Sequence, residues 1–128
     1  MILDSSALVA IALDEPERET FVAKLNAAPA VSVAGPTLVE AGIVLSARLG
    51  EDATGLLAGL VEASEAVVIE FGPRHWQEAL AAWWQFGRSR HPAALNMGDC
   101  LSYAAARVAG EPLLAKGDDF RLTDIELA

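Results

Sequence analysis

The sequence alternates between short apolar runs and longer segments with helical spacing, and this alternation is the feature that most constrains the fold. The apolar runs lie at residues 1–3, 31–33, 67–69 and 112–115. One of the intervening helices is predicted over residues 37–49, because Pro36 suits its start and Gly50 suits its end. Strands that are joined through helices form mainly parallel sheets with helices on both faces. We therefore predict an α/β fold with a mainly parallel central sheet.

Composition narrows the class of protein. The chain has 128 residues, of which 53% are hydrophobic and 21% charged, and we expect one packed domain over residues 1–128. A net charge of −9 argues against a nucleic-acid binder whose affinity depends on net positive charge. Cys100 is the only cysteine, which excludes internal disulfides and multi-cysteine zinc sites. The first residues have neither the length of a membrane span nor the charge of a signal peptide, so we expect a soluble, cytoplasmic protein.

Several acidic residues stand apart from those in polar surroundings. They are Asp4, Glu40, Asp99, Asp118 and Asp119. Asp4 ends the first apolar run, and Asp118 and Asp119 follow the last one. Because sites in parallel sheets form outside the carboxyl ends of the strands, these acids are expected at one edge. Asp4 and Asp99 each have an alternative role as a helix cap.

Crowded carboxylates repel one another, and a divalent cation bound among them removes that repulsion. A site rich in oxygen, with few or no His and Cys ligands, favours Mg²⁺ or Mn²⁺. The acidic residues therefore suggest a magnesium or manganese site.

Four segments in order resemble the motifs of the PIN-domain family, and most closely the VapC-type toxins of bacterial toxin–antitoxin pairs. The segments are residues 1–10, 39–41, 94–104 and 113–125. The resemblance implies a three-layer α/β/α PIN-like fold and a Mg²⁺- or Mn²⁺-dependent endoribonuclease that acts as a toxin. It also implies a cognate VapB-type antitoxin that blocks the site, and a homodimer.

The resemblance also implies roles for individual residues. Asp4 and Asp99 match the principal metal ligands. Glu40 matches the acid that completes the pocket and orients or deprotonates water. Ser6 matches a residue that hydrogen-bonds a ligand carboxylate, and its alternative role is a plain helix cap.

The fourth acid of the family matches Asp118 or Asp119, and the sequence alone does not decide between these neighbours. Asp119 is preferred because the acid directly before Phe120 resembles the more constant element of the motif. A metal ion in such a site lowers the pKa of a bound water and offsets charge on the phosphoryl oxygens. We expect in-line attack of this water on an RNA phosphodiester, which leaves 5′-phosphate and 3′-hydroxyl ends.

RNA contacts are expected from local cations, since the chain as a whole is acidic. Arg88 and Arg90 lie in a polar loop shortly before Asp99, and Lys116 lies beside the last acids. The alternative for this loop is an ordinary solvated segment. Trp76, Trp83 and Trp84 belong to the helix predicted over residues 74–86 and could stack on bases. Because Trp76, Leu80 and Trp83 recur at helical spacing, these three are expected in the core or a dimer interface instead.

Other functions compete with the nuclease interpretation. One is a PIN nuclease in RNA maturation, which the absence of an appended RNA-binding module disfavours. Another is a catalytically silent α/β protein-binding module, which the complete set of acids disfavours. A third is a phospho-acceptor domain with an aspartate nucleophile, but no paired acids stand beside Asp4 in the sequence.

Overall fold

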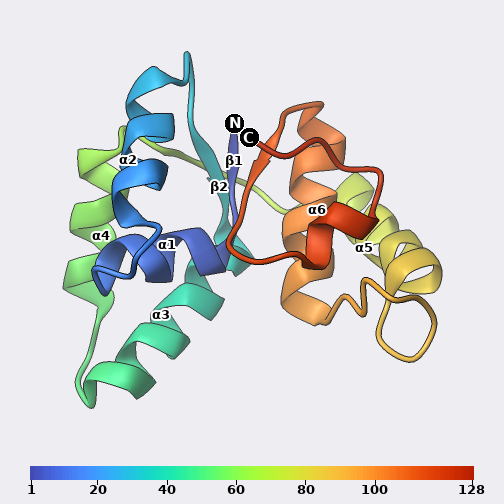
Figure 1. The fold of residues 1–128 in the computed structure, drawn as a ribbon, viewed down its shortest axis with the longest axis horizontal. Helices are drawn as coiled ribbons and strands as arrows, with labels where there is room; N and C mark the ends of the chain where they lie inside the picture. The colour runs from blue at the N-terminus through green and yellow to red at the C-terminus, as the bar shows by residue number, and fades with distance from the viewer.

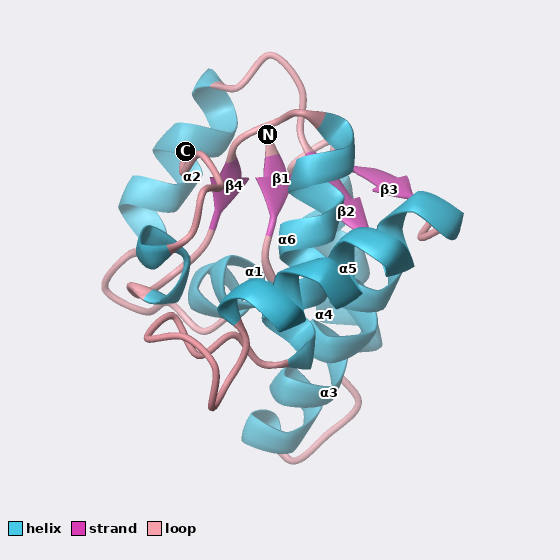
Figure 2. Cartoon of the chain, turned by 90° about the vertical axis from the view of Figure 1, so that its right-hand side faces the viewer, coloured by secondary structure: helices cyan, strands magenta, loops and turns pink.

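The computed structural model describes residues 1–128 and contains one four-stranded sheet, in which all neighbouring strands are parallel. The strands are β1 (Ile2–Leu3), β2 (Ser32–Ala34), β3 (Val67–Ile69) and β4 (Leu113–Leu114). Their order across the sheet is β3-β2-β1-β4, so the first and last strands are neighbours (Figure 2). The expectation that Asp4 and the acids after the last strand share one edge is confirmed, because β1 and β4 run in the same direction.

Helices cover both faces of the sheet, so the predicted three-layer α/β/α fold is confirmed (Figure 1). One layer contains α1 (Ser5–Ala12), α2 (Arg18–Ala27), α3 (Gly35–Leu49) and α4 (Thr54–Ala63). The opposite layer contains α5 (Pro73–Phe86) and α6 (Met97–Ala109), and a short 3₁₀ helix, η1 (Asp119–Leu122), follows β4. None of these helices has both the length and the apolar content that crossing a bilayer requires.

The core is divided in two by the sheet, because successive side chains of a strand point to opposite faces. Leu3, Val33 and Leu114 belong to the core cluster that includes residues of α1, α3 and α4. The adjacent residue of each of these strands belongs to the second cluster, together with residues of α5 and α6. Full burial of each large apolar side chain contributes about 1.5–3 kcal/mol, so even two-residue strands are firmly held.

The C-terminal segment, predicted to be a short tail, extends the sheet instead. The N–H of Leu113 donates to the Glu126 carbonyl at 2.9 Å, and the N–H of Ala128 donates to the Leu113 carbonyl at 3.0 Å. Leu127 thereby forms a parallel bridge with Leu113. The segment covers the outer edge of β4, whose backbone groups would otherwise lack partners.

The tryptophans of α5 do not lie in the core. Trp76, Trp83 and Trp84 are 54%, 37% and 60% exposed, whereas the small residues Ala79 and Ala82 face the interior. The core assignment is therefore wrong, because α5 packs closely through small side chains and turns its bulky ones outward. Their assignment to a dimer interface stays a prediction.

Candidate active site

Asp4 is both a helix cap and a carboxylate with one oxygen free. It follows β1, is 3% exposed and is the N-cap of α1. Its Oδ2 accepts hydrogen bonds from the Ser6 N–H at 2.9 Å and from the Ser6 hydroxyl at 2.5 Å. The Lys116 N–H donates to Ser6 Oγ at 2.9 Å, which orients the hydroxyl hydrogen towards Asp4. Asp4 Oδ1 is buried and has no hydrogen-bond partner.

Asp99 also combines a capping role with an unusual environment. In the first turn of α6, its N–H donates to Asn96 Oδ1 at 3.0 Å, and its Oδ2 accepts from the Asn96 N–H at 2.8 Å. Burial raises the pKa of Asp99 to about 6, although the Asn96 N–H opposes that shift. The negative charges of three nearby acids raise it further: Asp4, Asp119 and Glu40. The capping box uses Oδ2 and leaves Oδ1 outside it.

Glu40 reaches the same region from α3. Burial raises the pKa of this carboxyl above its usual value; the Ser5 hydroxyl opposes the shift, and the charge of Asp4 adds to it. Glu40 Oε2 is buried without a hydrogen-bond partner. A Cβ at Gly98 would lie only 2.1 Å from Glu40 Oε1, so the carboxylate fits because residue 98 has no side chain.

Gly98 is the residue of this site that sequence reasoning missed. The sequence feature that could have indicated it is a glycine in the first turn of a helix, directly before Asp99. Glycine within a helix is less stable than alanine by up to about 1 kcal/mol, so its presence there suggests a functional reason.

The two adjacent acids after β4 are placed differently. Asp119 begins η1, and its charge is one of those that raise the pKa of Asp99. The Asp118 side chain is 86% exposed, and its Oδ1 pairs with Arg121 Nε at 2.9 Å. The structure therefore brings Asp119 towards the other acids and turns Asp118 towards Arg121.

The acidic pocket, defined here as Asp4, Glu40, Asp99 and Asp119, gathers residues from four separate parts of the fold. No three His, Cys, Asp or Glu side chains are close enough together to coordinate one metal ion. The carboxylates would therefore have to move towards a bound cation. The donor set is nevertheless suited to Mg²⁺ or Mn²⁺, because it consists only of carboxylate oxygens. A cation would also satisfy the buried oxygens that lack partners in Asp4 and Glu40.

The neighbouring Cys100 is buried, with a thiol pKa raised to about 11 by burial and by Asp99, which makes it a poor nucleophile.

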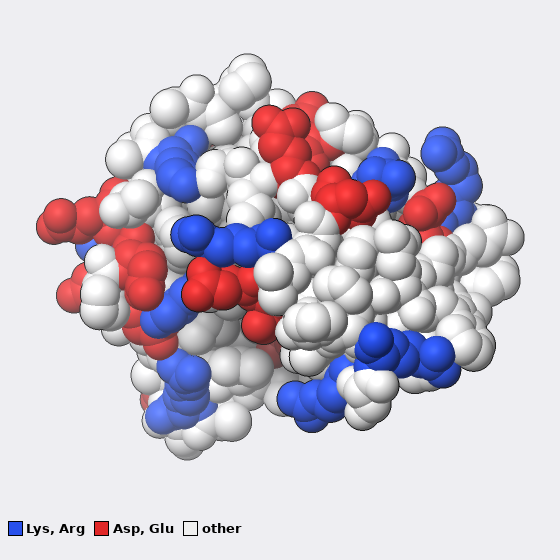
Figure 3. Space-filling view, turned by 45° about the vertical axis from the view of Figure 1, so that its right-hand side comes forward, with Lys and Arg blue, Asp and Glu red and all other residues white.

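Arg88 and Arg90 lie in the exposed loop between α5 and α6. The Arg90 guanidinium stacks on two rings, 4.3 Å from the centre of Trp83 and 3.9 Å from that of Trp84. Arg88 forms no ion pair. Figure 3 shows basic side chains along the lower right edge of the molecule and a mixture of acidic and basic groups elsewhere on that face. Local cations are thus available despite the negative net charge.

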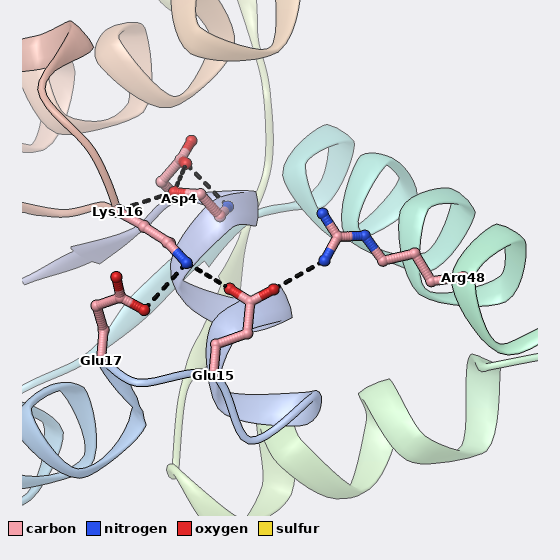
Figure 4. A network of polar contacts seen from close by, with 6 residues as sticks. Asp4, Glu15, Glu17, Arg48 and Lys116 are labelled. Carbon is pink, nitrogen blue, oxygen red and sulfur yellow. Dashed lines mark hydrogen bonds and ion pairs between the residues drawn. The ribbon is translucent and has the colours of Figure 1, made fainter.

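Lys116, the third cation predicted to contact RNA, takes part in an ion-pair network instead of projecting freely. Its Nζ lies 2.8 Å from Glu15 Oε2 and 3.0 Å from Glu17 Oε2. Glu15 Oε1 in turn accepts from Arg48 Nη1 at 2.8 Å, and Figure 4 shows this network next to Asp4.

An apolar groove of about 560 Å³ adjoins the acidic pocket between α3 and α6. Glu40 and Gly98 form part of its wall. Val39, Ile43 and Met97 are 62%, 65% and 77% exposed along it, which is unusual for large apolar residues. These exposed apolar side chains therefore lie directly beside Glu40.

Solved structures with the same fold are found among toxins. The crystal structure of VapC20 from Mycobacterium tuberculosis, described as a sarcin-ricin loop cleaving toxin, matches with a TM-score of 0.80 at 17% identity, over 99% of this chain and 97% of that one. A toxin–antitoxin complex from Klebsiella pneumoniae matches with a TM-score of 0.66 at 16% identity, over 93% of this chain and 88% of the other. These matches show a shared fold.

Sequence comparison identifies the family. The PIN domain model matches residues 1–126. The protein named Ribonuclease VapC of Mycolicibacterium smegmatis is 38% identical over 125 residues, which is 98% of this chain and 97% of that protein. Ribonuclease VapC28 of Mycobacterium tuberculosis is 41% identical over an alignment of 129 positions, which covers 100% of this chain and 97% of that protein. The matching fold, the four acids at one edge of the sheet and these relatives agree that the chain belongs to the PIN-domain family and, within it, to the VapC ribonucleases.

Proposed function

We propose that this chain is a divalent-metal-dependent endoribonuclease and the toxin of a toxin–antitoxin pair, with the acidic pocket as its active site. The observation that carries the proposal is Asp4 Oδ1, a buried carboxylate oxygen with no hydrogen-bond partner whose neighbours include further acids. Such an oxygen is costly in an apo site and is suited to bind a cation. The names of the VapC relatives support ribonuclease activity.

Each acid has a proposed role that follows from its surroundings. When bound, Mg²⁺ or Mn²⁺ lowers the pKa of water and offsets charge on the phosphoryl oxygens. Asp4 and Asp99 would hold the ion through the oxygens that helix capping leaves free. Glu40, whose pKa is raised by burial, is suited to accept the proton of the attacking water. Asp119 adds the fourth negative charge, and Ser6 holds the Asp4 carboxylate in place.

The proposed partners are an RNA substrate, a VapB-type antitoxin and a second copy of the chain in a homodimer. The apolar groove beside Glu40 supports an antitoxin that covers the acidic pocket. The Klebsiella pneumoniae structural neighbour is itself a toxin–antitoxin complex. We further propose that residues 1–128 act as one PIN domain in the cytoplasm.

The test uses purified protein, free of antitoxin, on total RNA with Mg²⁺, with Mn²⁺ or with EDTA. Asp99→Asn keeps the size of the side chain and an acceptor for the Asn96 N–H but removes the charge. Cleavage that requires metal, and is lost in Asp99→Asn, supports the proposal. Asp119→Asn should lose activity while Asp118→Asn keeps it, which tests the choice between these neighbours.

Analysis of the cut ends tests the chemistry separately. Attack by water leaves a 5′-phosphate and a 3′-hydroxyl, whereas a 2′,3′-cyclic phosphate would mean that the ribose 2′-hydroxyl is the nucleophile and would contradict the proposal. A folded protein that neither cleaves RNA nor binds Mn²⁺ would favour a catalytically silent protein-binding module.

A further inference from the structure

A second pocket lies beside the acidic pocket and contains two cationic side chains. Its volume is about 250 Å³. We call it the basic pocket, and its lining consists of Ser5, Ser6, Val9, Glu15, Val44, Arg48 and Lys116. Two of its lining residues also interact with the acids of the proposed active site. The Ser6 hydroxyl donates to the Asp4 carboxylate, and the Ser5 hydroxyl interacts with the Glu40 carboxylate and lowers its pKa.

A carboxylate of the chain itself sits between the two cations. Glu15 Oε1 lies 2.8 Å from Arg48 Nη1, and Glu15 Oε2 lies 2.8 Å from Lys116 Nζ (Figure 4). One anionic group thus offers a separate oxygen to each cation. The two non-bridging oxygens of a phosphodiester offer the same arrangement to Arg and Lys. Glu15 therefore occupies a position that suits an RNA phosphate.

The position of Lys116 is fixed relative to the proposed active site. Its N–H donates to Ser6 Oγ, which in turn donates to Asp4 Oδ2. Its ammonium group also pairs with Glu17, so it keeps an ionic partner when Glu15 leaves. The pocket therefore shares Ser6 and Lys116 with the hydrogen bonds that orient Asp4.

Displacement of Glu15 breaks two ion pairs at the protein surface. The Arg48 and Lys116 side chains are 55% and 36% exposed, and the Glu15 side chain between them is 20% exposed. Exposed ion pairs stabilise proteins by about 0–1 kcal/mol, because solvent already screens them. A phosphate that pairs with both cations replaces the lost contacts of Glu15 and releases the glutamate to water.

We propose that the basic pocket binds a phosphate of the RNA chain next to the one that is cleaved, and that Glu15 occupies this pocket in the free protein as an internal competitor. The inference rests on the proposed ribonuclease function and adds a substrate subsite to it. Arg48 and Lys116 bind the phosphate oxygens, while Glu15 turns to solvent. The subsite adds local positive charge beside the proposed active site of a chain with a net charge of −9.

The test is equilibrium binding of a fluorescent single-stranded RNA oligonucleotide in EDTA, where no cleavage occurs, over a series of salt concentrations. Glu15→Gln frees both cations and should bind about three- to fivefold more tightly than wild type at low salt. Its salt dependence should steepen, because in the wild type the released Glu15 carboxylate takes up counterions and offsets part of those that the RNA gives up. Glu19→Gln is the matched control: it changes the net charge equally but lies on α2, outside the pocket and without an ion pair.

Arg48→Gln gives an independent arm, because its exposed side chain is not required for folding, and thermal unfolding verifies this. It should bind RNA more weakly than wild type, and the Glu15→Gln/Arg48→Gln double variant should lose the gain. The inference is overturned when Glu15→Gln matches Glu19→Gln, or when Arg48→Gln binds like wild type. Metal-dependent cleavage measured in parallel separates the two proposals: cleavage without these binding effects refutes the basic pocket alone, and binding effects without cleavage refute the nuclease.

Discussion

Replacing Gly98 with alanine would place a methyl group where the Glu40 carboxylate now lies. The added Cβ would lie 2.1 Å from Oε1 and 2.3 Å from Oε2, whereas ordinary contacts begin near 3.4 Å. The carboxylate must therefore retreat by about 1 Å, which its flexible side chain permits. Misplacement of a catalytic group by about 1 Å costs roughly 100-fold in rate, and we expect a loss of that order in RNA cleavage.

Stability should not fall with activity in Gly98→Ala. Alanine is favoured over glycine within helices by up to about 1 kcal/mol, and the displaced Glu40 carboxylate gains contact with water. Gly59→Ala in α4 is the control, since nothing lies within 4 Å of its added Cβ. It should raise the melting temperature by roughly 3–5 °C and leave cleavage unchanged.

The assays are RNA cleavage with Mn²⁺ and thermal unfolding of both variants. Full cleavage by Gly98→Ala would refute the reasoning that Gly98 sets the position of Glu40. A loss of several kcal/mol in stability would show that the backbone of α6 moves rather than the glutamate.

Three further predictions concern other residues. The pKa of Asp99 is raised to about 6 in the folded protein, so the metal-free chain loses stability as the pH rises from about 4 through 6. In thermal melts at pH 8 with EDTA, Asp99→Asn should therefore be about 1 kcal/mol more stable than wild type, a figure that allows for solvent screening. At pH 4 the variant should show no such gain. The Cys100 thiol, with a pKa of about 11, should resist thiol reagents at pH 8 until the protein unfolds, and rapid labelling of folded protein would contradict its burial. Replacing both Arg88 and Arg90 with alanine should weaken RNA binding and reduce the slope of log binding constant against log salt concentration by up to about 1.4. An unchanged slope would mean that these residues do not contact RNA phosphates.

The layered fold was predictable because its signal is local. Each apolar run and each helical spacing lies within a short stretch of sequence, and punctuation such as Pro36 and Gly50 marks the ends of α3. The tail after η1 was not predictable in this way. Its pairing with Leu113 depends on β4 having an open edge, which is a property of the assembled sheet.

Contacts of individual site residues were only partly predictable. From the sequence, helix capping and metal binding are alternative roles for Asp4. In the structure Asp4 caps α1 through Oδ2, and its Oδ1 has no hydrogen-bond partner, so the two roles are compatible. The contact of Gly98 with Glu40 and the ion pair of Lys116 with Glu15 join residues far apart in the chain. No local pattern encodes either contact, which is why Gly98 was missed and the ion pairs of Lys116 were not predicted.

The pairing of β1 with β4 makes the completed sheet, and with it the proposed active site, depend on the last part of the chain. β1 needs partners on both sides, and the partner of Ile2 on one side is Leu113. A growing chain that has reached α5 contains Asp4 and Glu40 but neither Asp99 nor Asp119. Domains fold as units, and pairing of distant strands comes late in folding. The proposed active site therefore cannot be complete in a growing chain before residues 97–119 have been made.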